Sequence, residues 1–248
     1  CYHVFYHPKE LNLSASALLD GVSITGGNAD GDYPHYNGGG MYNYSSSPTL
    51  TNVKINLNTA YFGGGMYNYS SSPTLTNINI NLNTAPYDGG GMYNFNNSSP
   101  TLNNVNINLN TAKNKGGGMC NDYSSSPILT NVDIIENTAN YDGGGMCNDY
   151  SSSPILTNVN ITENTANSGG GMHNYDHSSP ILTNVNINLN KATNNGGGIY
   201  NYESSPILTN VNINLNKAAN NGGGIYNYES SPILTNVNII ENTANLGG

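Results

Sequence analysis

The chain contains no arginine, no tryptophan and few charged residues of either sign. Charged residues make up only 8% of its 248 positions, and six lysines against 15 acidic residues give a formal net charge of −9. An acidic chain of this kind is a poor partner for nucleic-acid phosphates. No apolar run approaches the roughly 18 residues of a membrane-spanning helix. We therefore expect neither a nucleic-acid partner nor a membrane span.

Cysteine is also scarce. The three cysteines are too few for a disulfide framework in a chain of 248 residues. Glycine and asparagine are abundant instead, a composition that disordered segments share. Apolar residues nevertheless return at fixed positions, and this regularity argues for an ordered fold.

The chain consists largely of one repeated sequence motif. The stretch Gly38–Ala60 reads GGGMYNYSSSPTLTNVKINLNTA, and the next 25 residues repeat it almost unchanged. Triple glycines are spaced by 25 to 27 residues and begin at Gly38, Gly63, Gly89, Gly116, Gly143, Gly169, Gly196 and Gly222. The length varies only around the serine run and just before the glycines, which predicts loops at these two places.

Within each repeat the apolar residues have a period of two. Residues 53–57 alternate apolar and polar side chains, which predicts a strand. The three-residue step from Leu50 to Val53 predicts a corner at Thr51 and Asn52. A second short strand is predicted over Met41–Tyr44, and the serine run reads as a turn.

A period near 26 residues, built from short strands and turns, fits one coil of a parallel β-helix. Coils stacked about 4.8 Å apart would bury a core that no single coil can bury. We predict an all-β fold, a single-stranded right-handed parallel β-helix (β-solenoid) of about nine coils with 25–27 residues each. Residues 1–37 would form an irregular N-terminal coil, and residues 38–248 eight regular repeats ending in a truncated ninth.

Asparagine occupies three slots in every repeat. Stacked amides pair up a column and satisfy polar groups at a corner that faces inward. We predict such a structural ladder, with the Asn52 slot pointing into the coil, at Asn43, Asn52, Asn58, Asn77, Asn104, Asn131, Asn158, Asn184, Asn210 and Asn236.

The pattern GGGMYN…SSPTLTNV…N…NTA resembles the right-handed parallel β-helix repeats of bacterial secreted and cell-surface proteins. Polymorphic outer-membrane proteins, adhesin and autotransporter passengers, and the wider pectate-lyase-like superfamily are similar. The opening stretch Tyr2–Gly31 resembles the irregular coil that precedes such repeats, with Ile24 and Ala29 in the slots of Ile55 and Ala60. The resemblance implies an extracellular or cell-surface bacterial protein with a structural or adhesive role.

Enzymatic activity is the alternative, as a polysaccharide lyase or hydrolase of the pectate-lyase-like group. Those enzymes usually set a Lys or Arg base beside several acids, and no repeat here carries a unique insertion that could wall a cleft. Glu136 and Glu163 would stack at a glycosidase spacing, but so would any two acids of one column. We expect no enzyme and no catalytic residues. An ice-binding protein is a minor alternative, because Thr-x-Thr arrays such as Thr49–Thr51 survive in only two repeats.

Tyrosines in the second strand are the best candidates for surface contact. Their rings stack on sugars or on other proteins, or they simply stabilise the sheet as a ladder. We predict that they face outward and bind a partner such as a cell-surface polysaccharide: Tyr42, Tyr44, Tyr67, Tyr69, Tyr200, Tyr202, Tyr226 and Tyr228.

Two irregular columns carry ligand types for metals, although we favour no cofactor. Cys120, Cys147 and His173 follow each other in the Tyr42 slot, with Asp122 and Asp149 two residues further on. Thiol, imidazole and carboxylate side chains suit a transition metal. The plainer interpretation is that the sequence varies without consequence at an exposed position. A Cys120–Cys147 disulfide is conceivable, but in-register parallel neighbours suit its geometry poorly.

The second irregular column is acidic and is formed by Asp176, Glu203 and Glu229. Like charges about one coil apart repel unless a cation or solvent relieves them, so calcium is a candidate ligand there. Loosely held, hydrated side chains are the alternative.

The two ends carry no polar cap. An open terminal coil presents free backbone N–H and C=O groups. We therefore expect the chain to continue into a longer protein or to stack on other copies of itself through the solenoid ends. Head-to-tail stacking would produce a filament or a surface stalk.

Overall fold

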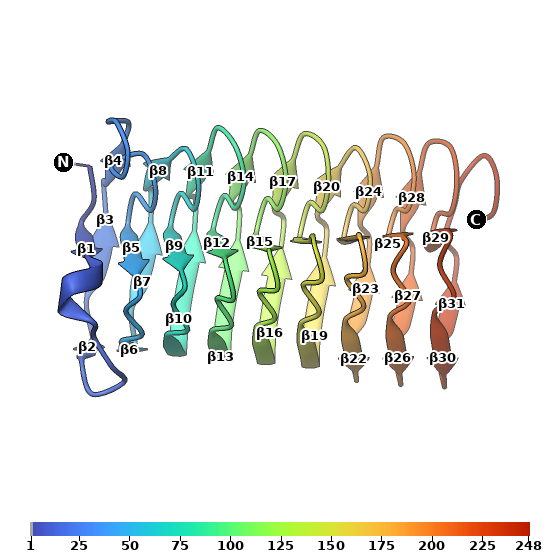
Figure 1. Cartoon of the computed structure of the whole chain (residues 1–248). Coiled ribbons are helices and arrows are strands. Elements are labelled where there is room, and N and C mark those ends of the chain that lie inside the picture. The colour runs from blue at the N-terminus through green and yellow to red at the C-terminus, as the bar shows by residue number, and fades with distance from the viewer. Residues whose placement is uncertain (1) are drawn as a thin grey trace.

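The computed structural model describes residues 2–248 as one rod of stacked coils, with the chain ends at opposite ends of the rod (Figure 1). The predicted all-β parallel solenoid is confirmed, and its one helical element among these residues is the short 3₁₀ turn η1 (Lys9–Leu11). Three parallel sheets run along the rod. The right-handed sense and the count of about nine coils stay predictions.

The first sheet contains nine strands, and all but the first strand are built from the residues that follow a triple glycine. Every pair is parallel and in register, so Met41 lies beside Met66 and Tyr42 beside Tyr67. In sheet order, the strands are β1 (Phe5–His7), β5 (Met41–Tyr44), β9 (Met66–Tyr69), β12 (Met92–Phe95), β15 (Met119–Asp122), β18 (Met146–Asn148), β21 (Met172–Tyr175), β25 (Ile199–Tyr202) and β29 (Ile225–Tyr228).

The second sheet has 14 strands, because several coils contribute two short strands separated by the corner at the Asn52 slot. In chain order, they are β2 (Leu18–Asp20), β3 (Ser23–Thr25), β6 (Thr49–Thr51), β7 (Lys54–Asn56), β10 (Thr74–Asn81), β13 (Thr101–Asn108), β16 (Ile128–Ile135), β19 (Ile155–Thr162), β22 (Ile181–Thr183), β23 (Asn186–Asn188), β26 (Ile207–Thr209), β27 (Asn212–Asn214), β30 (Ile233–Thr235) and β31 (Asn238–Ile240).

The third sheet has eight strands of two residues each, just after the buried Asn58 slot. They are β4 (Asn28–Ala29), β8 (Thr59–Ala60), β11 (Thr84–Ala85), β14 (Thr111–Ala112), β17 (Thr138–Ala139), β20 (Thr165–Ala166), β24 (Lys191–Ala192) and β28 (Lys217–Ala218). The N-terminal coil occupies the predicted slots. Ile24 pairs with Ile55 in the second sheet, and Ala29 pairs with Ala60 in the third.

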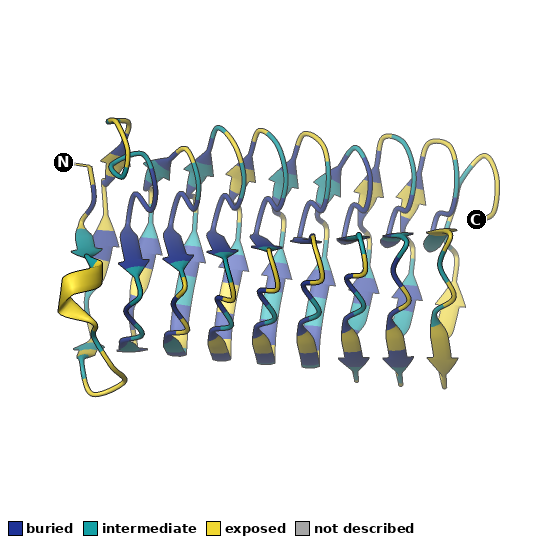
Figure 2. Ribbon diagram, in the orientation of Figure 1, coloured by how far each residue is buried: buried dark blue, intermediate teal, exposed yellow. Residues whose placement is uncertain are grey.

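A continuous apolar core fills the coils. Figure 2 shows that buried residues recur from coil to coil along the rod. Its repeating members are Met41, Leu50, Val53, Ile55 and their equivalents, all buried in the inner coils. The predicted alternation fails at Leu57, which is 59% exposed, because β7 ends at Asn56 and the chain turns there with a φ of 57°. Glu136 occupies the same slot and is exposed as well.

Two of the three asparagine columns point inward, as predicted. Asn94 donates from Nδ2 to Asn121 Oδ1 at 2.8 Å, and the same bond recurs along the Asn43 column. In the Asn58 column, Asn137 donates from Nδ2 to both Ile107 O at 2.9 Å and Asn164 Oδ1 at 3.0 Å. Both columns are buried in the inner coils, so their amides replace water for the groups at these corners.

The Asn52 column was predicted to point inward, and this was wrong. Its members form a ladder, for example from Asn77 Nδ2 to Asn52 Oδ1 at 3.1 Å, but the side chains are exposed. The backbone explains the residue type, because each member has a φ near 55°, a left-handed conformation that Asn tolerates better than most residues. The column consists of Asn52, Asn77, Asn104, Asn131, Asn158, Asn184, Asn210 and Asn236.

Glycine is required at the positions of the triple glycine because neighbouring coils approach each other too closely for a side chain. Gly116 has a φ of 64°, which turns the chain into β15. A Cβ on Gly118 would lie 2.6 Å from Gly145 O and 3.1 Å from the Asn137 side chain. The backbone of the next coil and the Asn58 column therefore occupy the space that a side chain on the third glycine would need.

The serine run is more than a turn. Ser125 is buried, and its backbone N–H donates to Ser152 Oγ at 3.0 Å. The equivalent bond links Ser98 to Ser125 and recurs in neighbouring coils. These hydroxyls pair the backbone where the regular sheet pattern is interrupted.

Candidate functional site

The outward face of the first sheet is covered by a second layer of the chain. Residues that directly precede a triple glycine lie over the Tyr42 slot in several coils, since Phe62 packs on its buried cluster and Asp142 lies near His173. Some neighbours in this stack are paired by isolated bridges, such as Asn37 with Phe62. We call these two columns together the outer layer. The covering column consists of Asn37, Phe62, Asp88, Lys115, Asp142, Ser168, Asn195 and Asn221.

This cover corrects the prediction that the tyrosines form an exposed contact surface. Tyr42 is 1% and Tyr67 6% exposed, and both belong to a buried cluster separate from the inner core. Alternation correctly placed their side chains opposite Met41, but it gave no sign of a layer outside them. The remaining predicted contact residues are partly buried, except for the exposed Tyr228: Tyr44, Tyr69, Tyr200, Tyr202 and Tyr226.

An aromatic cavity of about 360 Å³ opens in the outer layer over the first repeats. Its walls are Tyr33, Tyr36, Asn37, Tyr42, Phe62, Tyr67, Tyr69, Tyr93 and Phe95. Several of these rings pack on each other, with centroids 5.4 Å apart for Phe62 and Tyr93 and 5.3 Å apart for Tyr67 and Tyr93. A second hollow of about 500 Å³ adjoins it through Tyr36 and Phe62 and is bordered by Asp30 and Asp32.

Asn37 is the polar member of the aromatic cavity wall. The residue is 4% exposed, and among residues 2–248 its Oδ1 is the one buried side-chain N or O atom without a hydrogen-bond partner. A buried acceptor without a partner is costly. Asn37 therefore supplies an unused acceptor beside stacked aromatic rings.

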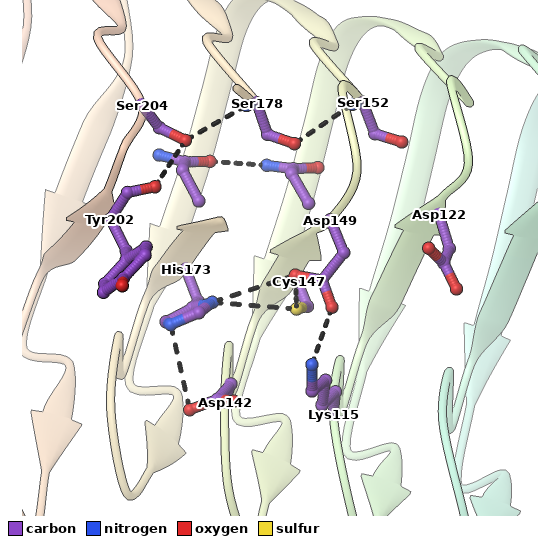
Figure 3. Close-up of polar contacts among 12 residues, drawn as sticks. Lys115, Asp122, Asp142, Cys147, Asp149, Ser152, His173, Ser178, Tyr202 and Ser204 are labelled. Atoms are coloured by element: carbon purple, nitrogen blue, oxygen red, sulfur yellow. Dashed lines mark hydrogen bonds and ion pairs between the residues drawn. The ribbon is translucent and has the colours of Figure 1, made fainter. Parts of the chain in front are cut away.

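Further along the outer layer, aromatic side chains give way to a polar cluster, made of Lys115, Asp142, Cys147, Asp149 and His173 (Figure 3). Cys147 Sγ lies 3.2 Å from Asp149 Oδ1 and 3.9 Å from His173 Nδ1. His173 Nδ1 lies 4.0 Å from Asp149 Oδ1. The side chains of these three residues, which the sequence singled out, thus converge, although at a buried position and not at the exposed one expected.

Lys115 and Asp142 were missed by the sequence reasoning. Lys115 Nζ pairs with Asp149 Oδ2 at 2.8 Å, and Asp142 Oδ1 lies 3.8 Å from His173 Nε2 (Figure 3). Both residues directly precede a triple glycine, so counting back from the glycines would have placed them in one column. The variable loop length before the glycines obscured this alignment.

Burial dominates the electrostatics of the polar cluster. It lowers the pKa of His173 to about 4, so the imidazole is neutral at pH 7. Burial likewise raises the pKa of the Cys147 thiol and of the Asp142 carboxyl. Burial alone would lower the pKa of Lys115, but the hydrogen-bonded Asp149 carboxylate keeps it raised, so the ammonium stays charged.

Cys120 and Asp122, the other two predicted ligands, lie one coil away. Cys120 pairs in register with Cys147, and both are free thiols, not the disulfide considered above. Burial raises the pKa of Cys120 to about 12. Asp122 accepts hydrogen bonds from the Tyr93 hydroxyl at 2.8 Å and from the Tyr123 backbone at 2.9 Å, and burial raises its pKa to about 6.

The second predicted acidic group is partly assembled. Asp176 and Glu203 lie together with His177, with ligand atoms within 4.8 Å of one another, while Glu229 is not part of this group. His177 Nδ1 lies 2.6 Å from Asp176 Oδ1, and its side chain is 73% exposed. This group is open to solvent, where paired side chains need no cation.

Comparison with known proteins gives no relative: no family model, no curated protein and no solved structure matches the chain. Within residues 2–248, no helix has the length and apolar character needed to cross a bilayer.

Proposed function

We propose that the protein is a non-enzymatic adhesive solenoid, located outside a bacterial cell or on its surface, that binds a neutral saccharide in the aromatic cavity. The observation that carries this proposal is the cavity itself, whose wall combines aromatic rings with Asn37, a residue whose Oδ1 has no hydrogen-bond partner. Its volume of about 360 Å³ lies within the range of small-ligand sites.

The chemistry of the cavity fits a sugar. The apolar faces of sugar rings pack on aromatic side chains, and sugar hydroxyls donate to acceptors such as Asn37 Oδ1. The adjoining hollow adds the carboxylates of Asp30 and Asp32 as acceptors. These acids and the net charge of −9 favour a neutral saccharide over a polyuronate.

The solenoid itself would serve as a stiff support for this site. In-register pairing runs through all three sheets. We propose a filament or stalk built on this rod as the form in which the site is displayed.

The test is a glycan array probed with the full chain and two variants. Tyr33→Ala removes an aromatic ring of the cavity wall that is 65% exposed, and Tyr141→Ala removes a ring that is 60% exposed outside the cavity. We expect the wild type and Tyr141→Ala to bind the same neutral glycans and Tyr33→Ala to bind them at least about tenfold more weakly. Absence of any bound glycan, or equal binding by all three proteins, would contradict the proposal.

The polysaccharide-lyase alternative has one observation in its favour. Lys115 lies among acids, as a lyase base would, since Asp88, Asp142 and Asp149 are its electrostatic neighbours. A base must be neutral, however, and the raised pKa of Lys115 keeps it protonated. Turnover of polygalacturonate that Lys115→Ala abolishes would establish the alternative, and we expect no turnover from either protein.

A further inference from the structure

We infer that the polar cluster is a transition-metal site, in which Cys147 Sγ, Asp149 Oδ1 and His173 Nδ1 bind one Zn²⁺-class ion. Thiolate, imidazole and carboxylate are the donors that zinc takes in proteins. This inference is independent of saccharide binding, because none of the three residues lines the aromatic cavity.

The three donor atoms already form a triangle of the right size. Tetrahedral zinc with ordinary bond lengths sets its donors about 3.4 to 3.6 Å apart. The observed separations are 3.2 Å from Sγ to Oδ1, 3.9 Å from Sγ to Nδ1 and 4.0 Å from Nδ1 to Oδ1. Shifts of about 0.3 to 0.6 Å, which small side-chain rotations provide, would complete the geometry.

The sheet register explains why the donors meet. Cys147 and His173 are direct neighbours in β18 and β21, and Asp149 follows Cys147 by two residues on the same face. Cys120, the in-register neighbour of Cys147 on the other side, is the nearest further thiol. The parallel pairing fixes Cys147 beside His173, and Asp149 directly follows the paired residue Asn148.

The partners of the ligands also match a metal site. A histidine ligand usually donates its second ring N–H to a carboxylate. Asp142 Oδ1 lies 3.8 Å from His173 Nε2, so that hydrogen bond would form after a shift of somewhat less than about 1 Å. Asp149 would bind the ion through Oδ1 while Lys115 holds Oδ2 at 2.8 Å. The Lys115 contact thus orients Asp149 without occupying its donor atom, and Asp142 is the carboxylate next to the second nitrogen of His173.

Charge and burial favour a cation as well. Cys147, Asp149 and His173 are each at most 4% exposed. The carboxyl groups of Asp88, Asp122, Asp142 and Asp149 face a single ammonium, that of Lys115, in this part of the outer layer. Asp149 is buried and the other three residues are half-buried, and such acids in excess over their cationic partners are relieved by a bound cation. Binding would replace the Cys147 thiol proton with a metal–sulfur bond and release that proton to solvent.

Two substitutions remove a ligand while respecting the fold. His173→Tyr places a residue that already occupies this slot at Tyr200 and Tyr226, and Cys147→Ser keeps the size of the side chain. His177→Asn is the matched control, because it removes the exposed histidine of the acidic group and leaves the polar cluster intact. Circular dichroism and thermal unfolding of metal-free protein would verify that each variant is folded.

The experiment uses the full chain without an affinity tag, purified under reducing conditions. Metal content by mass spectrometry comes first, followed by Co²⁺ titration of the stripped protein and displacement by Zn²⁺. We expect one ion per chain and a near-ultraviolet band from the cobalt–thiolate bond. Cys147→Ser should lose this band, and His173→Tyr should weaken Zn²⁺ binding by more than the 10- to 100-fold typical of outer contacts. His177→Asn should behave as the wild type.

Three results in the wild type and the ligand variants would overturn the inference, and a fourth comes from the control. They are the absence of stoichiometric binding in the wild type, unchanged binding in both Cys147→Ser and His173→Tyr, and a Cys120–Cys147 disulfide in the native protein. A loss of binding in His177→Asn alone would place the ion in the exposed acidic group and would equally reject the polar cluster.

Discussion

Replacement of Asn137 by alanine is the sharpest test of the buried Asn58 column, to which Asn137 belongs. The Asn137 side chain is fully buried and bonds in both directions along the rod. Its Oδ1 accepts from the Asn110 backbone N–H and from Asn110 Nδ2, both at 3.0 Å, and its Nδ2 donates to Ile107 O and Asn164 Oδ1. Asn137→Ala removes all four bonds at once.

The expected cost follows from the groups left behind. The buried Asn110 N–H donates to Asn137 Oδ1, and an orphaned buried donor costs about 1 to 3 kcal/mol. The two lost bonds from Asn137 Nδ2 contribute about 1 kcal/mol each. We therefore expect Asn137→Ala to lower the free energy of unfolding by about 4 kcal/mol.

Asn131→Gly is the matched control in the same coil. Asn131 is exposed, has a φ of 54° and makes one exposed side-chain bond, from Asn158 Nδ2 at 3.2 Å. Glycine adopts this backbone conformation without strain, so we expect a loss below about 1 kcal/mol. The contrast between the two variants separates an inward column from an outward one.

Guanidinium unfolding followed by circular dichroism, together with hydrogen exchange at the Asn110 amide, would measure both effects. A solenoid opens locally, so exchange reports the neighbouring coil directly. A loss of about 4 kcal/mol corresponds to roughly 1,000-fold less protection at Asn110. The reasoning is refuted if Asn137→Ala unfolds at the wild-type denaturant concentration with Asn110 still protected, or if Asn131→Gly costs as much.

Two further predictions follow from the same structure. Gly118→Ala should lower stability by about 1 to 3 kcal/mol, since its Cβ would meet Gly145 O at 2.6 Å, whereas Asn140→Ala on the exposed surface should be neutral in the same denaturation assay. His173 has a folded pKa lowered from 6.5 to about 4, so its contribution is present above pH 6.5 and is lost as the pH falls towards 4. Metal-free wild type should therefore lose up to about 3 kcal/mol more than His173→Tyr over this range in pH-dependent unfolding, and parallel pH profiles would contradict the assignment.

The repeat and its alternation were enough to predict the solenoid. The return of Val53 and Ile55 in every copy fixed the strands and the stacking, since only in-register coils bury them together. The direction of the Asn52 column could not be read in the same way. Asparagine is favoured at a buried corner, where its amide forms hydrogen bonds, and also at an exposed corner with a left-handed backbone. The sequence shows the same residue in both cases, so it does not reveal which one applies.

The site was predictable only in part. Cys147, Asp149 and His173 came from one strand column and its register, which the repeat alignment shows directly. Their burial, and the contacts with Lys115 and Asp142, depend on how a loop of variable length folds back over the sheet. Alternation says which face a side chain takes, but not whether another segment covers that face, so Tyr42 and Tyr67 were misjudged for the same reason.

Calorimetric titration with the neutral saccharide that binds best on the array tests the proposed function most directly. The account predicts one binding site per chain, because the proposed site is the aromatic cavity over the first repeats. It also predicts weaker binding by Tyr33→Ala than by Tyr141→Ala. Several equivalent sites per chain, unaffected by Tyr33→Ala, would instead assign binding to the repeating surface of the rod and contradict the account.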